Sequence, residues 1–205
     1  MKTKLLIISI CFIILQLYYH KQTIYCIFNN KKNIPTPDYI IKEIKNTIKN
    51  KININDSFIF YDIGCGDGNM INKVFIPNKF KKYIGIEYDK QTHQNSESIN
   101  EQIDLVLDNA LTYNYLNMPS VIYLYEPFYS FNYYNSIKMY HKLFKQIKNR
   151  CKKRIYIFYL TGDLLLGNPY LYKSKLLNKY KLISEKNIYR PLILKFNKLL
   201  IYQIN

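Results

Sequence analysis

The chain has 205 residues, which suits one domain with a substantial core and a short appendage. Its formal net charge of +16 permits attraction to phosphates or to an anionic membrane face. However, 27 lysines against three arginines, one alanine and no tryptophan fit the codon usage of an AT-rich genome, to which we attribute most of the charge. The four cysteines are widely spaced and the three histidines isolated, which argues against a zinc site, a disulfide framework and a Ser-His-Asp triad.

The N-terminal segment is apolar and has basic flanks. Lys2 and Lys4 precede the apolar residues 5–15, and bulky rather than small residues follow. This pattern is typical of a membrane anchor or a secretory signal, and a buried helix of a soluble protein is the third alternative. A helix over residues 5–19 would extend about 22 Å, short of the roughly 30 Å hydrocarbon core. We favour an uncleaved anchor: an N-terminal hydrophobic helix within residues 1–28, followed by a linker over residues 29–35.

From residue 36 onward, helix and strand signals alternate. Thr36 as N-cap, Pro37 at the first helical position and Asp38 in the first turn predict the start of a helix. Seven strands are expected, over residues 57–63, 82–86, 103–107, 121–125, 154–160, 181–184 and 199–204. Further helices are expected over residues 69–74, 90–100, 134–150 and 164–178. The alternation predicts one α/β domain over residues 36–205, with a parallel sheet covered on both faces.

The loop after the first strand is rich in glycine. Asp62 lies just before this loop, and three of the six glycines of the chain follow as Gly64, Gly66 and Gly68. Such a loop turns sharply and lets a ligand approach closely, and its place between a strand and a helix is typical of nucleotide-like ligands. Asn69 stands where a dinucleotide-binding loop needs its later glycine, and no Gly-Lys-Ser/Thr of a P-loop follows.

The hydrophobic–Asp–x–Gly–x–Gly–x–Gly pattern resembles that of the class I methyltransferases, which use S-adenosylmethionine (SAM). The resemblance covers roughly residues 36–205. It implies a doubly wound, mostly parallel seven-stranded sheet, SAM as the cofactor and no metal. In that family the glycine loop cradles the methionine part of the cofactor, with the acidic residue before it organising the loop. Here this implies a role for Asp62, Gly64, Cys65, Gly66 and Gly68.

Two further motifs fit the same resemblance. In the family, an acidic residue that ends strand two binds the ribose hydroxyls; here this is Glu87, whose two acceptor oxygens match the two donors of a cis-diol. An acidic or amide residue after strand three contacts the adenine, which matches Asp108 or Asn109, and Tyr88 is placed to pack on the adenosine. All these residues follow strand ends, where doubly wound sheets bind ligands.

The fourth strand leads to Glu126-Pro127-Phe128. Methyltransferases that modify planar amino groups have Asn/Asp-Pro-Pro-Tyr/Phe at this place, and another set of class I domains has Asn-Pro-Phe, so the resemblance implies that these three residues face the methyl acceptor. Glu126 stands in place of Asn or Asp and is suited to accept a proton from an amine such as lysine. The alternative is that the strand merely ends here and Phe128 packs.

We therefore predict a single-pass membrane protein, anchored through residues 5–19, with a SAM-dependent methyltransferase domain facing the cytosol. The methyl acceptor is unidentified, and a protein lysine amine is favoured over nucleic acid. Two alternatives stay open: a catalytically inactive SAM-fold interaction module at a membrane, and a nucleic-acid methyltransferase, which the basic charge and the abundant tyrosines favour.

Overall fold

The computed structural model describes residues 35–125, 127–128, 133–161, 171, 176–188 and 197–204. The hydrophobic segment within residues 1–28, nearly all of the linker, Glu126 and most of the helix expected over residues 164–178 lie outside this description. Among the described residues, no helix has both the length and the apolar character needed to span a membrane.

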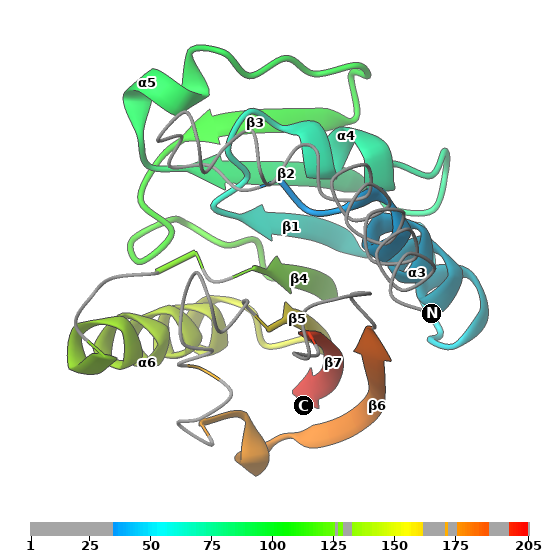
Figure 1. The fold of residues 1–205 in the computed structure, drawn as a ribbon, viewed down its shortest axis with the longest axis vertical. Helices are drawn as coiled ribbons and strands as arrows, with labels where there is room; N and C mark the ends of the chain where they lie inside the picture. Colours follow the sequence, from blue (N-terminus) through cyan, green and yellow to red (C-terminus); the bar gives the residue numbers. More distant parts are fainter. Residues whose placement is uncertain are drawn as a thin grey trace, which may run out of the picture.

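Seven strands form one sheet in the order β3-β2-β1-β4-β5-β7-β6 (Figure 1). Strands β1 to β5 pair in parallel, and β7 is antiparallel to both β5 and β6. The expected doubly wound, mostly parallel seven-stranded sheet is therefore confirmed. The strands are β1 (Ile59–Ile63), β2 (Lys82–Glu87), β3 (Ile103–Leu107), β4 (Ser120–Leu124), β5 (Ile155–Leu160), β6 (Lys181–Ile188) and β7 (Asn197–Ile204).

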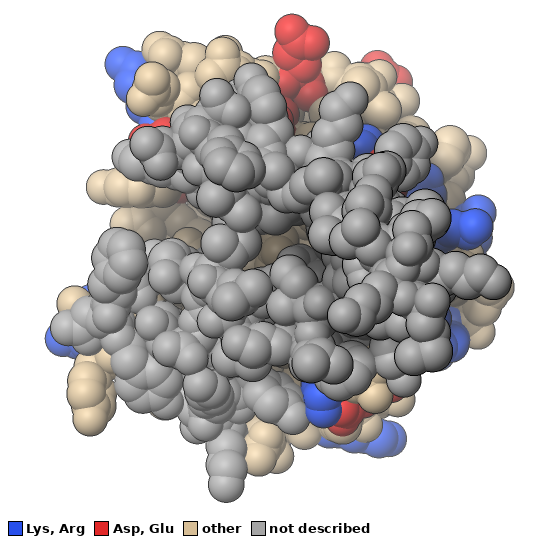
Figure 2. All heavy atoms as spheres, in the orientation of Figure 1, with Lys and Arg blue, Asp and Glu red and all other residues tan. Residues whose placement is uncertain are grey.

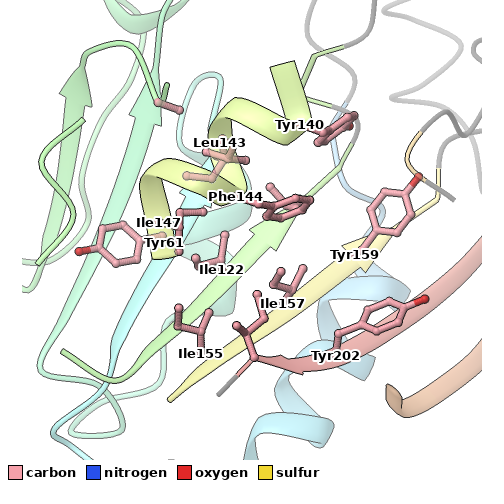
Figure 3. Packing of buried hydrophobic residues seen from close by; sticks show 14 of the residues in the cluster. Tyr61, Ile122, Tyr140, Leu143, Phe144, Ile147, Ile155, Ile157, Tyr159 and Tyr202 are labelled. Atoms are coloured by element: carbon pink, nitrogen blue, oxygen red, sulfur yellow. The ribbon is translucent and has the colours of Figure 1, made fainter. Parts of the chain in front are cut away.

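Helices cover both faces of this sheet (Figure 1). Helices α3 (Asp38–Asn50) and α4 (Asn69–Val74) pack on one face, in a core that includes Phe60 of β1. Helix α6 (Tyr133–Arg150) packs on the opposite face, where Tyr140, Leu143, Phe144 and Ile147 meet apolar side chains of β4 and β5 (Figure 3). Because successive strand residues point to opposite faces, the continuous apolar runs of the central strands supply both cores.

The helix expected over residues 90–100 is much shorter than its polar sequence suggested. Helix α5 covers only Lys90–His93, with the Asp89 carboxylate accepting a hydrogen bond from the backbone N–H of Thr92 at 3.0 Å. Beyond it, side chains bond to nearby backbone instead: Ser96 Oγ donates to the carbonyl of His93, and Ser98 Oγ to that of Ile103. Serine and asparagine compete with a helix in this way, which explains why the prediction was wrong.

Strand β6 extends to Ile188, four residues beyond its expected end at Ser184. Its pairing with β7 shifts register between Leu182 and Ser184. Such a bulge breaks the alternation of apolar and polar residues from which a strand is predicted. A short 3-10 helix, Leu176–Lys179, precedes it.

The start of α3 also differs from the expectation. Pro37, not Thr36, is the N-cap residue, and its carbonyl accepts hydrogen bonds from the backbone N–H groups of Ile40 and Ile41. Thr36 instead lies buried, and its hydroxyl forms a 2.9 Å hydrogen bond with the hydroxyl of Tyr123 in β4. Thr36 therefore bonds to a residue 87 positions away instead of capping the helix next to it. This bond attaches α3 to the middle of the sheet.

We predict that Thr36→Val lowers the free energy of unfolding by about 1–3 kcal/mol, because the buried Tyr123 hydroxyl loses its partner. Tyr123→Phe should cost a similar amount, and the double variant less than the sum of the two, since neither polar group is then left unsatisfied. Urea denaturation of the four proteins measures this coupling. Strict additivity would contradict the assigned bond.

Candidate cofactor site

The loop between β1 and α4 adopts a backbone that favours glycine at three positions. The φ angles of Gly64, Gly66 and Gly68 are 74°, 61° and 80°, all in the left-handed region. A side chain there would be strained, so this loop requires the glycines that the sequence places in it.

Hydrogen bonds attach this loop to the end of β2. The backbone N–H groups of Gly64 and Cys65 both donate to the carbonyl of Ile86, at 2.8 and 3.2 Å. The N–H of Gly66 donates to Glu87 Oε2 at 3.0 Å, and Glu87 Oε1 accepts from the N–H of Asp89 at 2.7 Å. The structure thus brings together two motifs that the resemblance had assigned to one ligand. Each carboxylate oxygen has two lone pairs, so Glu87 keeps capacity to accept bonds from hydroxyl groups.

Asp62 lies buried in β1, just before its last residue and two positions before Gly64. Its Oδ2 atom has no hydrogen-bond partner among the described residues, and the loop is held by Ile86 and Glu87 instead. Burial raises the pKa of this carboxyl to about 7, and the negative charges of Glu87 and Asp67 add to the effect. A buried acidic group without a partner is costly, and groups with such shifted pKa values concentrate at functional sites.

Cys65 turns its side chain into the protein. The thiol is buried, and burial is the main cause that raises its pKa, followed by the negative charge of Asp62. It fills the space beside Gly85 in β2, where an added Cβ would lie 2.8 Å from Cys65 Sγ and 2.8 Å from a methyl carbon of Leu105. Of the expected contacts of Cys65 with a cofactor, only those of its backbone fit this arrangement.

Gly85 is a residue that the sequence analysis missed. It has no catalytic group, but it leaves the room that lets the glycine loop lie against β2. An isolated glycine inside an apolar strand was the available signal, since it indicates a close approach of backbone or side chain.

Asp108 and Asn109 follow the carboxyl end of β3, on the side of the sheet where Glu87 ends β2. Their polar groups form a compact turn: Asp108 Oδ1 accepts from the N–H of Asn109, and Asn109 Oδ1 from that of Leu111. The N–H of Asp108 donates to the carbonyl of Glu87 at 2.9 Å, which joins this turn to the end of β2. Tyr88, next to Glu87, is 76% exposed and therefore accessible to a ligand.

Pro127 lies directly against the glycine loop. A Cβ added to Gly64 would lie 3.1 Å from the Cβ of Pro127, so the motif after β4 and the loop after β1 are in contact. The ring of Phe128 packs on Tyr140 of α6, with ring centroids 5.2 Å apart, and its carbonyl accepts a hydrogen bond from Ser136 Oγ at 2.8 Å. Packing of Phe128 agrees with the structural alternative for this residue. Glu126 lies outside the described residues.

These residues gather beside β1, where the order in which successive strands are added to the sheet reverses. β1 has β2 on one side and β4 on the other: the chain runs from β1 through β2 to β3 and then returns past β1 to β4. The ends of neighbouring parallel strands diverge there and open a crevice, which is where doubly wound sheets bind ligands. A cationic group would compensate the Asp62 carboxylate, and hydroxyl groups suit Glu87, so these residues fit a ligand that carries both.

Comparisons with known proteins bear on the fold. No protein-family model matches the chain, and no curated protein matches it significantly. Among solved structures, it is similar to a Listeria monocytogenes protein named as a candidate class I SAM-dependent methyltransferase, with a TM-score of 0.60 and 17% identity; the match covers 92% of this chain but 66% of that one, just under two thirds.

It is also similar to the N-methyltransferase NodS from Bradyrhizobium japonicum, with a TM-score of 0.60, 9% identity and coverage of 79% of this chain and 94% of that one. A third match is TYW2 from M. jannaschii in complex with AdoMet (SAM), with a TM-score of 0.52, 14% identity and coverage of 84% and 78%. At these identities the likeness concerns the fold. The chain has the fold of the class I SAM-dependent methyltransferases.

We predict that Asp62→Asn stabilises the protein at neutral pH but not in acid. The folded carboxyl has a pKa of about 7 and the unfolded one about 4, so the native state binds the proton more tightly between these values. The wild type should therefore lose stability relative to the variant as the pH rises from 4 to 7, by roughly 2–4 kcal/mol in total.

Denaturant unfolding at several pH values measures this difference. Asp56→Asn, which changes an exposed carboxylate, is the matched control for loss of surface charge. A constant difference between wild type and Asp62→Asn across this pH range would contradict the assignment.

Proposed function

We propose that this chain is a SAM-dependent methyltransferase and that the cofactor lies over the glycine loop. The observation that carries the proposal is the buried Asp62 carboxylate, whose Oδ2 has no partner among the described residues and which precedes three left-handed glycines in the chain. SAM carries positive charge on its sulfonium and ammonium groups, so it is a ligand that would compensate this buried negative charge.

The other residues of the site fit the remaining parts of the same ligand. Glu87 would bind the ribose hydroxyls with the acceptor capacity left after its bonds to Gly66 and Asp89. Asp108 and Asn109 would contact the adenine, and the exposed ring of Tyr88 would close over the adenosine.

Bound SAM supplies an already activated methyl group. The protein therefore needs no dedicated acid–base pair: it has to hold the acceptor in line with the methyl group and exclude water. Pro127, in contact with Gly64, is the described residue of the acceptor motif that lies nearest the loop. The expectation of a lysine acceptor depends on Glu126 and stays a prediction. Anchoring through residues 5–19, with the domain facing the cytosol, is likewise a proposal.

We predict that Glu87→Ala weakens the binding of SAM and S-adenosylhomocysteine by about 1.5–3 kcal/mol, the scale of hydrogen bonds to a charged group. Calorimetric titration of the full-length chain measures the affinity. Glu101→Ala removes an exposed carboxylate from the same β2–β3 unit and should leave the affinity unchanged. If the folded wild type binds neither compound, the proposed function is wrong.

A second prediction concerns the pH dependence of this binding. In the free protein the Asp62 carboxyl has a pKa of about 7, and a bound cation would lower it, so binding should release a proton between pH 5.5 and 7. The affinity for SAM should therefore rise over this range in the wild type and stay flat in Asp62→Asn. The α-amino group of SAM titrates mainly above this range, with a pKa of about 8. The same dependence of affinity on pH in both proteins would contradict the placement of the SAM cation beside Asp62.

A further inference from the structure

The positive charge of this protein is unevenly distributed along the chain. Residues 35–108 carry nine lysines and eleven acidic residues, whereas residues 109–161 carry eight lysines and arginines and one acidic residue. Several acidic side chains visible in Figure 2 lie at the top of the molecule, where Figure 1 shows α5 and β3. AT-rich codon usage raises lysine along the whole chain, but it gives no reason for acidic residues to be lost from one part.

The unbalanced cations gather on α6 and the residues that follow it. All are exposed, and within the described part of the chain none forms an ion pair: Lys138, Lys142, Lys145, Lys148, Arg150, Lys152, Lys153 and Arg154. Lysines elsewhere do pair with carboxylates, as Lys73 does with Asp38 at 2.7 Å and Lys82 with Asp104 at 2.6 Å. The surface of α6 is therefore a source of uncompensated positive potential.

A groove runs between this helix and the loop after β3. Lys142, Lys145 and Asn149 line it from α6, and Asn109 and Thr112 line it from the loop. The two walls are joined by a hydrogen bond from Gln146 Nε2 to the carbonyl of Tyr113 at 3.0 Å. Asn109 therefore belongs both to this groove and to the proposed adenine contact.

We propose that this groove and the exposed cations of α6, together the basic groove, bind a nucleic acid whose base is the methyl acceptor. The inference rests on the proposed methyltransferase function and supplies its substrate class, a nucleic acid in place of the lysine amine expected from the sequence. Lysines at 138, 142 and 145 recur on one side of the helix, a spacing that lets several of them contact successive phosphates. The amide side chain of Asn149 can donate to and accept from base edges.

The chemistry of α6 favours a nucleic acid over a lipid surface. Helices that lie on membranes bury an apolar face among the lipids. The exposed positions of α6 from residue 135 to residue 150 are all polar or charged, and its apolar side chains are used in the core. Tyr134, 81% exposed at the start of the helix, follows the acceptor motif and is suited to stack on a base.

The test compares two matched double variants of the full-length chain. Lys142→Gln with Lys145→Gln removes two charges from the basic groove, and Lys42→Gln with Lys49→Gln removes two exposed charges from α3. Fluorescence anisotropy with a labelled 20-nucleotide RNA and DNA strand measures affinity at several salt concentrations. Vesicles with anionic phosphatidylserine are tested in parallel, and calorimetry with SAM reports on the cofactor site.

We expect the wild type to bind the strand with an affinity that falls steeply with salt. The groove variant should lose affinity about 10-fold and lower the salt slope by about 1.4, the value for two contacts to a single strand. The α3 variant should change affinity less than about 2-fold, and both should bind SAM as the wild type does. A preference for RNA or for DNA identifies the substrate and supports the proposal in either case.

Four results would overturn the inference. Equal losses in the two double variants would show unspecific attraction by net charge. Binding to the vesicles but to neither strand would assign the surface to a membrane. If the protein binds a strand but not SAM, the groove has no part in methyl transfer. If it binds SAM but neither strand, the proposed function stands and only the nucleic-acid substrate is removed.

Discussion

The candidate site depends on the attachment of the glycine loop to the end of β2. The Ile86 carbonyl accepts two loop N–H groups and the Glu87 carboxylate a third, so the loop cannot take its shape independently of the neighbouring strand. This attachment requires left-handed glycines on one side and the bare Cα of Gly85 on the other, where Cys65 packs. Glu87 consequently has two roles, since the carboxylate proposed to bind ribose also orders the loop that lies beside it.

The carboxylate of Asp62, which precedes this loop, is buried, and its burial costs folding free energy. A carboxyl held at a pKa of about 7 lowers the stability of the free protein at neutral pH, and a bound cation would recover that free energy. Net charge also distinguishes two parts of the domain. The part that holds the glycine loop, residues 35–108, is slightly acidic and suits a cationic ligand, whereas the part with α6, residues 109–161, is strongly basic and suits an anionic one. Pro127, from the motif proposed to face the methyl acceptor, lies in the basic part and contacts Gly64 in the acidic part.

Much of this could be predicted because the signals were local. Apolar runs between polar helices indicated the buried strands, and glycines at positions 64, 66 and 68 indicated the turn that their φ angles require. Contacts between distant residues could not be predicted from one sequence. Thr36 is a good N-cap residue by type, yet it bonds to Tyr123, and Gly85 matters because of Cys65 and Leu105. Helix α5 ends early because Ser96 and Ser98, which follow it, bond to nearby backbone, a competition that polarity alone does not reveal.

The measurement that tests the central claim most directly is hydrogen–deuterium exchange of the full-length chain with and without S-adenosylhomocysteine. A ligand over the glycine loop should slow exchange in peptides that cover residues 62–68, 87–89 and 108–110. These segments lie far apart in sequence and meet at the carboxyl ends of the parallel strands. Peptides from the β6–β7 edge should not change. Protection confined to other peptides, or no protection at a saturating concentration, would contradict the claim that this loop is a SAM site.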